Sequence, residues 1–394
     1  MMQTLILSCN TGEGHNSCAR AIEEYYKKMG EPCRVEEGLQ FISPGFSKFI
    51  SWGHSFVYKY LPRLFRWGYG CAERHPSIFS ENALLYRLLT CGTERLYQYI
   101  KEHGYDTVIC THVFTSLMLT DVLRKHPMDM VTAFVATDYT CSPSVKDSCL
   151  DYYFIPDSLL TEEFVCENIP TGKVVCSGIP IRQMFYENFE SKDAENEAVK
   201  SEAVKSDAAK LPGTEKKRPG NLLIMCGSMG CGPIAELLQK LSAVRNGDWE
   251  ITVVCGRNER LYRKLLKRYG KEKHIHIKGY VQNMASMMEQ ADLYLTKPGG
   301  ISVSEAAVKG LPMLLVDAVA GCEEYNRRYF VAQGGAKTAE SPEELTRICT
   351  SLMEDEESLC DMRKHLEGLR KLTSSQIIFE TLKEGHRVNE KKKE

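Results

Sequence analysis

The first candidates for chemistry are a histidine behind two glycines and an aspartate at the end of an apolar run. His15 stands in the segment SCNTGEGHNS, residues 8–17, which directly follows the apolar residues 5–7. Asp138 closes the run VTAFVATD at 131–138. Neutral imidazole accepts a proton near neutral pH, and a carboxylate can do the same or orient a histidine. The segment around His15 therefore fits three interpretations: a phosphate-binding loop, a structural turn, or a loop that presents a general base.

Glycine turns in the second half of the chain form another group of candidates. They follow short apolar runs and comprise Gly227 with Gly230, Gly256, and Gly299 with Gly300. Glycine lets the backbone approach a ligand, and the helix after such a turn offers free N–H groups to an anion. Such turns are also common structural punctuation. Neither the Walker pattern nor the dinucleotide fingerprint G-x-G-x-x-G occurs, which disfavours ATP and NAD as ligands.

Apolar runs of strand length alternate with helical spacing in both halves of the chain, which predicts parallel strands joined by right-handed crossovers. The predicted fold class is α/β, with two Rossmann-like doubly wound domains that face a cleft. Ligands are expected there, at the carboxyl ends of the strands. Strands are expected at 4–8, 107–111, 131–138, 152–156, 221–226, 250–256 and 311–317. A short strand and turn is expected at 274–281, and a strand that runs into glycines at 291–300. Helices are expected at 17–29, 114–125, 233–241 and 302–309.

The domain boundary is marked by a change of composition. The repeat NEAVKSEAVKSDAAK has few large apolar residues, so it cannot bury enough surface to fold alone. It predicts a linker at 187–220, either helical or disordered, between domains at 1–186 and 221–372. Residues 373–394 are expected to form a C-terminal helix and tail that pack back on the first domain.

Bulk composition restricts the function classes. The chain has 394 residues, a net charge of −2 and 16 cysteines without a C-x-x-C pair. A chain of this size without a secretory leader predicts reduced thiols in a cytosol. The sequence contains no run of 18 apolar residues, so no membrane span is predicted. The net charge gives no general attraction to nucleic acid. A cytoplasmic protein, free or on the cytosolic face of a membrane, is expected.

Residues 38–72 hold no acid, yet they combine basic side chains with ten aromatic ones, nine of them within 46–69. Basic and aromatic side chains together suit the headgroup region of an anionic bilayer. The alternatives are an ordinary helical hairpin packed on the core and, less favoured without an RNA-binding module, a stacking platform for nucleic acid. The residues predicted to contact the acceptor or the membrane are Trp52, Phe56, Lys59, Arg63, Phe65, Arg66 and Trp67.

The motifs of the second half are more specific when they are taken together. The segment 279–336 contains GYVQNM, TKPGG, SEAAVKGLP and a G-x-E-x-x-N pattern, and TGEGH, TD, SGIPIR and VVCGRN occur elsewhere. This set resembles glycosyltransferase family 28. Within it, the resemblance is to diacylglycerol glycosyltransferases of the monogalactosyldiacylglycerol synthase and processive diacylglycerol glucosyltransferase type. It covers nearly the whole chain except the repeat linker.

The resemblance implies a GT-B fold, with an acceptor domain at 1–186 and a donor-binding domain at 221–372. It implies an inverting transfer of a hexose from UDP-glucose or UDP-galactose to diacylglycerol, with no metal and no cofactor, by a peripheral protein on the inner membrane face. His15 would be the catalytic base, and Asp138 would be an alternative base or would orient His15. Anionic lipids are expected partners and nucleic acid is not. The oligomeric state stays open.

Donor contacts are likewise implied by the resemblance. The start of the helix after Gly300 would balance the diphosphate charge in place of Mg²⁺. Glu305 would bind the ribose, residues 279–281 the uracil, and Glu323 and Asn326 the sugar. The full set of implied donor-binding residues is Gly227, Ser228, Arg257, Gly279, Tyr280, Val281, Lys297, Gly299, Gly300, Ser302, Glu305, Gly321, Glu323 and Asn326.

One position departs from the family pattern. The family usually has P-G-Q-E, whereas residues 320–323 read A-G-C-E, so Cys322 replaces a glutamine amide with a weakly hydrogen-bonding thiol. The choice between glucose and galactose is therefore left open. Two other functions remain alternatives: N-acetylglucosamine transfer to a lipid-linked cell-wall precursor, and a non-catalytic, membrane-bound sugar-nucleotide-binding protein.

Overall fold

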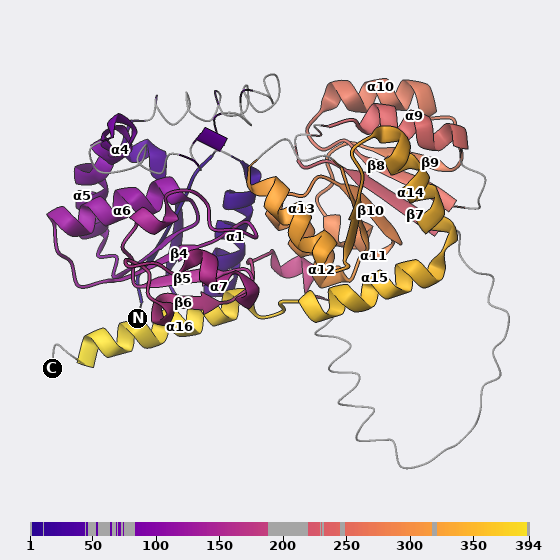
Figure 1. Cartoon of the computed structure of the whole chain (residues 1–394). Coiled ribbons are helices and arrows are strands. Elements are labelled where there is room, and N and C mark those ends of the chain that lie inside the picture. The colour runs from indigo at the N-terminus through magenta and orange to yellow at the C-terminus, as the bar shows by residue number, and fades with distance from the viewer. Residues whose placement is uncertain are drawn as a thin grey trace, which may run out of the picture.

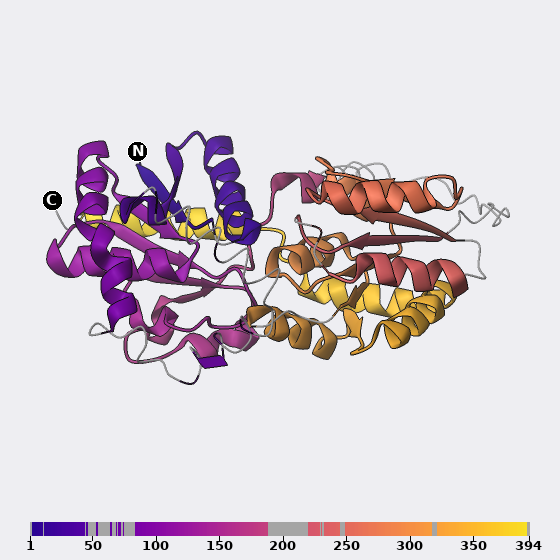
Figure 2. The ribbon, with the colours of Figure 1, turned by 90° about the horizontal axis from the view of Figure 1, so that it is seen from above.

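The computed structural model describes residues 2–10, 12–43, 83–187, 220–228, 230, 232–244, 249–316 and 321–391, with single residues between 45 and 74. The linker predicted at 187–220 lies outside these residues except for its two ends. The seven predicted acceptor or membrane residues also lie outside: Trp52, Phe56, Lys59, Arg63, Phe65, Arg66 and Trp67. The described chain forms two α/β domains that lie side by side (Figure 1 and Figure 2).

The N-terminal domain is built on six parallel strands in the order β2-β1-β3-β4-β5-β6. The runs TLILS of β1 and TVIC of β3 are fully buried, as expected where helices cover both faces of a parallel sheet. The strand order reverses between β1 and β3, where ligands bind in doubly wound folds. The strands are β1 (Thr4–Ser8), β2 (Cys33–Glu37), β3 (Thr107–Cys110), β4 (Val131–Val135), β5 (Tyr152–Ile155) and β6 (Val174–Cys176). The helices are α1 (Glu13–Lys28), α4 (Leu84–Leu89), α5 (Thr93–His103), α6 (Val113–Lys125) and α7 (Thr161–Phe164).

The C-terminal domain repeats this plan with the order β12-β11-β10-β7-β8-β9, again all parallel. Its order reverses between β7 and β10, so the turns after these two strands meet at the expected ligand position. The strands are β7 (Gly220–Met225), β8 (Trp249–Val254), β9 (Ile275–Lys278), β10 (Leu293–Thr296), β11 (Met313–Leu315) and β12 (Ala336–Thr338). The helices are α9 (Ile234–Val244), α10 (Glu259–Tyr269), α11 (Met284–Glu289), α12 (Gly300–Lys309), α13 (Cys322–Ala332), α14 (Pro342–Glu354) and α15 (Glu356–Leu369).

The two doubly wound domains are confirmed, but several predicted boundaries were wrong. The helix expected at 17–29 begins four residues earlier, at Glu13, so His15 lies in a helical turn rather than in a loop. The strand expected at 131–138 ends at Val135, which leaves Asp138 in the following loop. Strand β7 begins at Gly220, a residue placed in the predicted linker. Strands β2, β6 and β12 were not expected, because β2 and β12 carry charged residues and β6 has only three residues.

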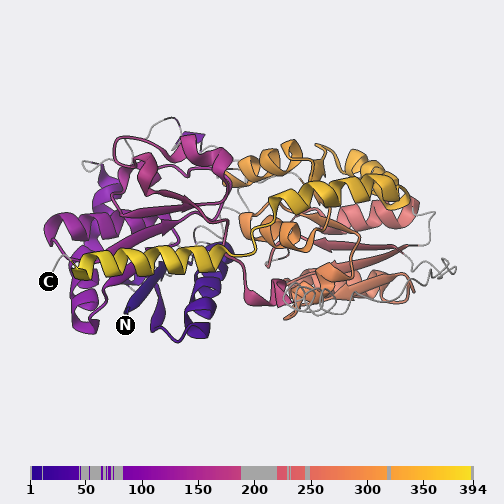
Figure 3. The same ribbon diagram turned by 90° about the horizontal axis from the view of Figure 1, so that it is seen from below.

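The last helix, α16 (Ser374–Lys391), leaves the C-terminal domain and lies along the N-terminal one (Figure 3). Its Phe379 packs edge-on against Tyr26 with ring centroids 5.0 Å apart, and both are buried in one apolar cluster. Lys383 pairs with Glu31 at 3.2 Å. The chain therefore crosses between the domains a second time. None of the helices in the described ranges combines the length and the apolar character needed to cross a membrane.

Candidate active site at the facing edges of the two sheets

His15 lies at the carboxyl edge of the N-terminal sheet, where the strand order reverses. It belongs to the first turn of α1, directly after β1, and its ring is half-buried. Its Nδ1 atom lies 2.7 Å from the carbonyl oxygen of Thr111, the residue that follows β3. Thr137, in the loop after β4, places its Oγ1 atom 3.1 Å from the same nitrogen. Three neighbouring strands thus position one imidazole.

The hydrogen bonds of His15 determine its tautomer. Because a carbonyl oxygen can only accept, Nδ1 carries the proton and Nε2 of the neutral ring is left unprotonated. Burial lowers the pKa of His15 below its usual value, while the Asp138 carboxylate and the Thr111 carbonyl act in the opposite direction. The ring is therefore neutral at neutral pH, which is the state that a general base needs.

Asp138 stands beside His15 at the same edge. Its Oδ1 atom accepts a hydrogen bond from Asn326 Nδ2 at 2.7 Å, and its Oδ2 atom lies 3.4 Å from Thr137 Oγ1. Burial raises the pKa of Asp138 above the usual carboxyl value, although the Asn326 bond and His15 partly oppose this. Thr137 contacts both side chains, so a hydrogen-bond path joins the imidazole to the carboxylate. Through it, Asp138 can orient the ring and stabilise its protonated form.

The predicted donor-binding residues gather at the carboxyl edge of the C-terminal sheet, because all six strands are parallel. At its centre, a Cβ on Gly227 after β7 would stand 3.8 Å from Lys297 Cε after β10. Lys297 Nζ reaches Glu323 Oε1 at 3.1 Å.

On the other side of β7, a Cβ on Gly256 after β8 would collide with the carbonyl oxygen of Ser228 at 2.2 Å, so only glycine allows this approach. The guanidinium carbon of Arg257 lies 5.6 Å from the centre of the Tyr280 ring. Tyr280 stands between Gly279 and Val281 in the loop after β9. Contacts between neighbours therefore connect the turns after β9, β8, β7, β10 and β11 into one row.

The start of α12 meets the N-terminal domain directly. A Cβ on Gly300 would stand 2.0 Å from the carbonyl oxygen of Thr137 and 3.1 Å from Asp138 Oδ1, so glycine is required at this contact. Gly299 precedes the helix, and Ser302 in the first turn places its hydroxyl 3.0 Å from Tyr294 Oη. A helix N-terminus favours negative charge. In this arrangement the Asp138 carboxylate lies where the donor diphosphate was expected.

Glu305 lies further along α12 and is half-buried at the domain interface. Burial raises the pKa of Glu305 to about 8, and the nearby Arg182 acts to lower it. Arg182 itself belongs to the SGIPIR segment and is held by Glu24 on α1 at 2.6 Å. Glu305 is thus an acid in a poorly solvated position next to the expected donor site, and it is protonated over much of the neutral range.

Asn326 makes interdomain contacts that its expected role in reading the sugar did not suggest. It is 0% exposed, and its two amide hydrogens go to Asp138 Oδ1 and, at 2.9 Å, to the carbonyl oxygen of Pro298. Its Oδ1 accepts from Tyr139 N at 2.6 Å. The nearby Cys322, at the family's glutamine position, lies 3.5 Å from Ser142 Oγ, and Gly321 before it has a φ of 68°. Asn326 therefore fastens the two domains together in this arrangement.

Two further residues at the interface were not predicted as site residues. Glu13 joins the N-terminal domain to the carboxyl edge of the C-terminal sheet, with Arg20 at 2.9 Å on one side and Arg257 at 2.8 Å on the other. Tyr139 inserts between α12 and α13, where it stacks on Tyr329 and lies 3.1 Å from Ser304 Oγ. Glu13 is part of the TGEGH motif, two residues before His15. This position in the motif could have identified it as a site residue. Tyr139 follows the TD motif directly, but its insertion depends on the packing of the two domains.

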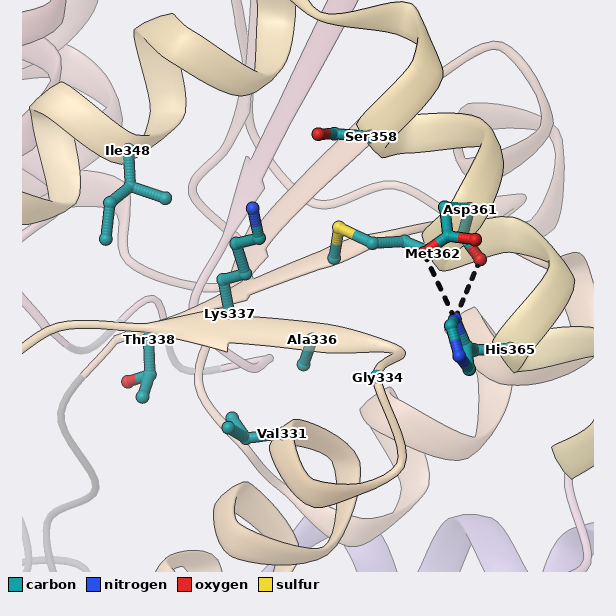
Figure 4. A pocket seen from close by; sticks show the side chains of 10 residues that line it. All are labelled: Val331, Gly334, Ala336, Lys337, Thr338, Ile348, Ser358, Asp361, Met362 and His365. Carbon is teal, nitrogen blue, oxygen red and sulfur yellow. Dashed lines mark hydrogen bonds and ion pairs between the residues drawn. The ribbon is translucent and has the colours of Figure 1, made fainter.

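A pocket of about 450 Å³ lies away from these residues, along edge strand β12 and between α13 and α15 (Figure 4). None of the predicted site residues lines it. Its only histidine, His365, is turned back onto its own helix, 2.9 Å from the carbonyl oxygen of Asp361. The chemistry expected of the chain therefore belongs to the facing sheet edges and not to this pocket.

Comparisons with known proteins agree with this architecture. Residues 15–181 match the family model described as monogalactosyldiacylglycerol (MGDG) synthase, and residues 221–376 match the glycosyltransferase family 28 C-terminal domain. The chain is 28% identical over 400 residues to a processive diacylglycerol beta-glucosyltransferase of Bacillus subtilis, covering 99% of this chain and 97% of the relative. It is 26% identical to a probable chloroplastic monogalactosyldiacylglycerol synthase of Glycine max, covering 88% and 64%.

Among solved structures, MurG of Acinetobacter baumannii superposes with a TM-score of 0.63 at 14% identity, covering 98% of this chain and 100% of that one. At this identity the likeness concerns the fold alone, and it is the GT-B arrangement of two Rossmann-like domains. The family models of both halves of the sequence and the fold of both domains thus indicate the same family. The chain belongs to glycosyltransferase family 28, to the diacylglycerol glycosyltransferase type that includes MGDG synthase.

Proposed function

We propose that the protein is an inverting glycosyltransferase that moves glucose or galactose from a UDP-sugar to the hydroxyl of 1,2-diacylglycerol. The reaction needs no metal ion, and the protein works as a peripheral protein at the cytosolic face of a membrane. The observation that carries this proposal is the imidazole of His15. Its Nδ1 proton is fixed by Thr111, its pKa is lowered by burial, and it stands next to Asp138 at the domain interface.

His15 acts as the general base in this mechanism. Its unprotonated Nε2 takes the proton from the lipid hydroxyl while the oxygen attacks the anomeric carbon. The imidazolium that forms is stabilised by Asp138 through Thr137. Attack from the face opposite the departing nucleotide inverts the configuration. The B. subtilis relative is named as a beta-glucosyltransferase, and a β-glucoside formed from an α-linked sugar nucleotide is the product of an inversion.

The leaving UDP is stabilised by the C-terminal domain. Negative charge develops on the diphosphate as the sugar departs, and preorganised donors and cations at that place lower the barrier. The start of α12 supplies N–H groups and a favourable dipole, and Lys297 and Arg257 place cations on the same edge. These groups take the part that Mg²⁺ plays in other transferases. Diacylglycerol as acceptor is supported by the names of the relatives that align over most of the chain.

The test is an assay with labelled UDP-glucose and UDP-galactose on diacylglycerol vesicles, with and without a chelator. We expect labelled glycolipid with one of the two donors and the same rate in the chelator. No labelled lipid with either donor would show the proposal to be wrong, and transfer of N-acetylglucosamine to a lipid-linked precursor would replace it. Loss of activity in the chelator would refute the metal-independent step alone.

Two histidine variants test the base. His15→Gln should lower kcat at least ~100-fold, the usual contribution of a general base, with UDP affinity changed less than about twofold. His103→Gln is the matched control, because His103 also bonds a backbone carbonyl through Nδ1, at 2.9 Å, but lies exposed at the end of α5. Equal loss of turnover and UDP binding in His15→Gln would remove the role assigned to it.

A further inference from the structure

The positive charge of the C-terminal domain is concentrated in one segment. Residues 257–278 contain nine lysines and arginines against two glutamates, a net charge of +7, whereas the whole chain carries −2. Most of this segment is helix α10 with the short loop that follows it. The rest of the chain is therefore acidic overall, and a general excess of basic residues does not explain the cluster.

The charges on α10 form a stripe. Arg260, Lys264 and Lys267 follow one another at intervals of four and three residues, which places them on one face of α10. Lys271 continues this spacing in the turn just after the helix ends at Tyr269. All four are exposed. Half a helical turn away, Leu265 and Tyr269 are buried in the domain core. The stripe therefore faces directly away from the protein, on the upper side of the C-terminal domain in Figure 1.

The stripe is not neutralised from within the described part of the chain. The glutamate of α10, Glu259, pairs with Arg263 at 2.8 Å, beside the stripe. No described acid forms an ion pair with any of the four stripe residues. Like charges three and four residues apart destabilise a helix by a few tenths of a kcal/mol for each pair. The stripe thus opposes the folding of its own helix, and an external anionic partner would relieve this repulsion.

We propose that the stripe on α10 is a docking surface of the donor domain for an anionic lipid bilayer. The choice of a bilayer rests on the proposed function, because an enzyme whose acceptor is diacylglycerol must work at a membrane surface. The side chain of Leu266, which is 42% exposed on the flank of the helix, adds apolar area. Basic side chains around an exposed leucine are typical of helices that lie on an anionic membrane.

Two features relate this surface to the site. Helix α10 begins two residues after Arg257, which lies at the donor edge and contacts Glu13. In the N-terminal domain, α4 exposes Leu84 by 84% and Leu88 by 40%, and it lies on the same upper side in Figure 1. A membrane on this side would contact both domains at once. The stripe then holds the donor domain on the surface from which the lipid hydroxyl is taken.

The test measures the binding of the full-length protein to vesicles of phosphatidylcholine, alone or mixed with phosphatidylglycerol. Lys264→Gln/Lys267→Gln removes two charges of the stripe. The matched control, Arg347→Gln/Lys364→Gln, removes two exposed charges that lie outside the stripe, on α14 and α15. At about tenfold or somewhat less per basic residue at an anionic surface, the stripe variant should bind mixed vesicles roughly ten- to thirtyfold more weakly. The control should keep wild-type binding, and added salt should reduce the difference.

Other outcomes would overturn the proposal. It is wrong if wild-type protein does not distinguish the two kinds of vesicle, if the stripe variant binds mixed vesicles like wild type, or if the control loses as much. The stripe variant should also unfold at the same temperature as wild type or higher, and a lower one would indicate a structural role. Binding needs no turnover, so this result stands apart from the glycosyltransferase assay. With detergent-dispersed diacylglycerol, the stripe variant should be as active as wild type.

Discussion

Asn326 of the C-terminal domain donates a hydrogen bond of 2.7 Å to the carboxylate of Asp138 in the N-terminal domain. The same side chain accepts from Tyr139 N and donates to the carbonyl oxygen of Pro298, so all three of these bonds are made by one fully buried amide. The C-terminal domain therefore holds in place the acid at the edge of the N-terminal domain. Because Asp138 also lies against the start of α12, the diphosphate of the proposed donor would bind at that helix only after the two edges separate.

Replacing Asn326 should weaken the contact between the two domains. Asn326→Ala removes three hydrogen bonds, one of them to a carboxylate, and should cost about 3 kcal/mol of unfolding free energy in urea denaturation. Asn326→Asp keeps the shape but sets a second carboxylate against Asp138. In the folded state, the two carboxyl groups bind one proton between them more tightly than they do in the unfolded chain. This variant should therefore regain stability as the pH is lowered toward 5.

The control for Asn326 is Tyr139→Phe, which removes a different hydrogen bond across the same interface, the one to Ser304. It should cost about 1 kcal/mol and show no recovery at acidic pH. If Asn326→Asp is destabilised equally at pH 5 and pH 7, Asn326 and Asp138 are not in contact in solution.

The pH dependence of kcat/KM separates the roles of His15 and Asp138. As the proposed base, His15 must be neutral, and burial lowers its pKa, so the acidic limb of the profile should lie below the ordinary imidazole value of about 6.5. The Asp138 carboxylate raises the pKa of His15. Asp138→Asn should therefore move the acidic limb to still lower pH, with a reduced but measurable kcat.

A different result would reassign the base. If Asp138→Asn abolishes turnover and His15→Gln retains most of it, the carboxylate takes the proton and the histidine positions it. His112 provides a control, because its ring lies edge-on to His15 at 4.5 Å but its Nδ1 accepts from Phe114 N. His112→Asn should leave the position of the acidic limb unchanged.

In the proposed function, the ion pair between Glu13 and Arg257 competes with the donor for the Arg257 guanidinium. Both side chains are substantially exposed, so the pair adds less than about 1 kcal/mol to stability. Glu13→Gln should leave the melting temperature nearly unchanged but tighten UDP binding severalfold, because Arg257 no longer has to leave a carboxylate. Titration calorimetry with UDP measures this, with Arg20→Gln, which removes the other partner of Glu13 at 2.9 Å, as control. Tighter binding in Glu13→Gln that persists in an Arg257→Gln background would mean that Arg257 is not involved.

The sequence was sufficient to predict the turns of the site but not the contacts between the domains. Apolar runs followed by glycines mark strand ends, and parallel strands bring those ends to one edge, so Gly227, Lys297 and Gly300 could be grouped in advance. The start of α1 was missed because the glycines at 12 and 14 are poor helix formers. Asn326 and Asp138 are 188 residues apart, and no local pattern indicates that they meet. Their contact depends on how two separately folded sheets face each other.

Glu305 should make the stability of the protein depend on pH. Burial raises its pKa to about 8, against an ordinary value of 4.5. The folded chain thus binds the proton more tightly than the unfolded one, and the resulting stability is complete below pH 4.5 and lost as the pH rises through about 8. Glu305→Gln mimics the protonated acid, so it should match wild type below pH 4.5 and exceed it by about 2–4 kcal/mol at pH 9.

Glu324 provides the control of opposite sign for Glu305. Although burial acts to raise the pKa of Glu324, its bonds to Arg327 and Arg328 hold it below the usual value. The stability that it contributes is present above the unfolded pKa and is lost in acid. Glu324→Gln should therefore be less stable than wild type at pH 7 and approach it at low pH. Urea denaturation at several pH values measures both variants. A Glu305→Gln variant that is less stable than wild type at pH 9 would mean that Glu305 is charged and well solvated. The carboxylate could then accept a hydrogen bond from a ribose hydroxyl without first losing a proton.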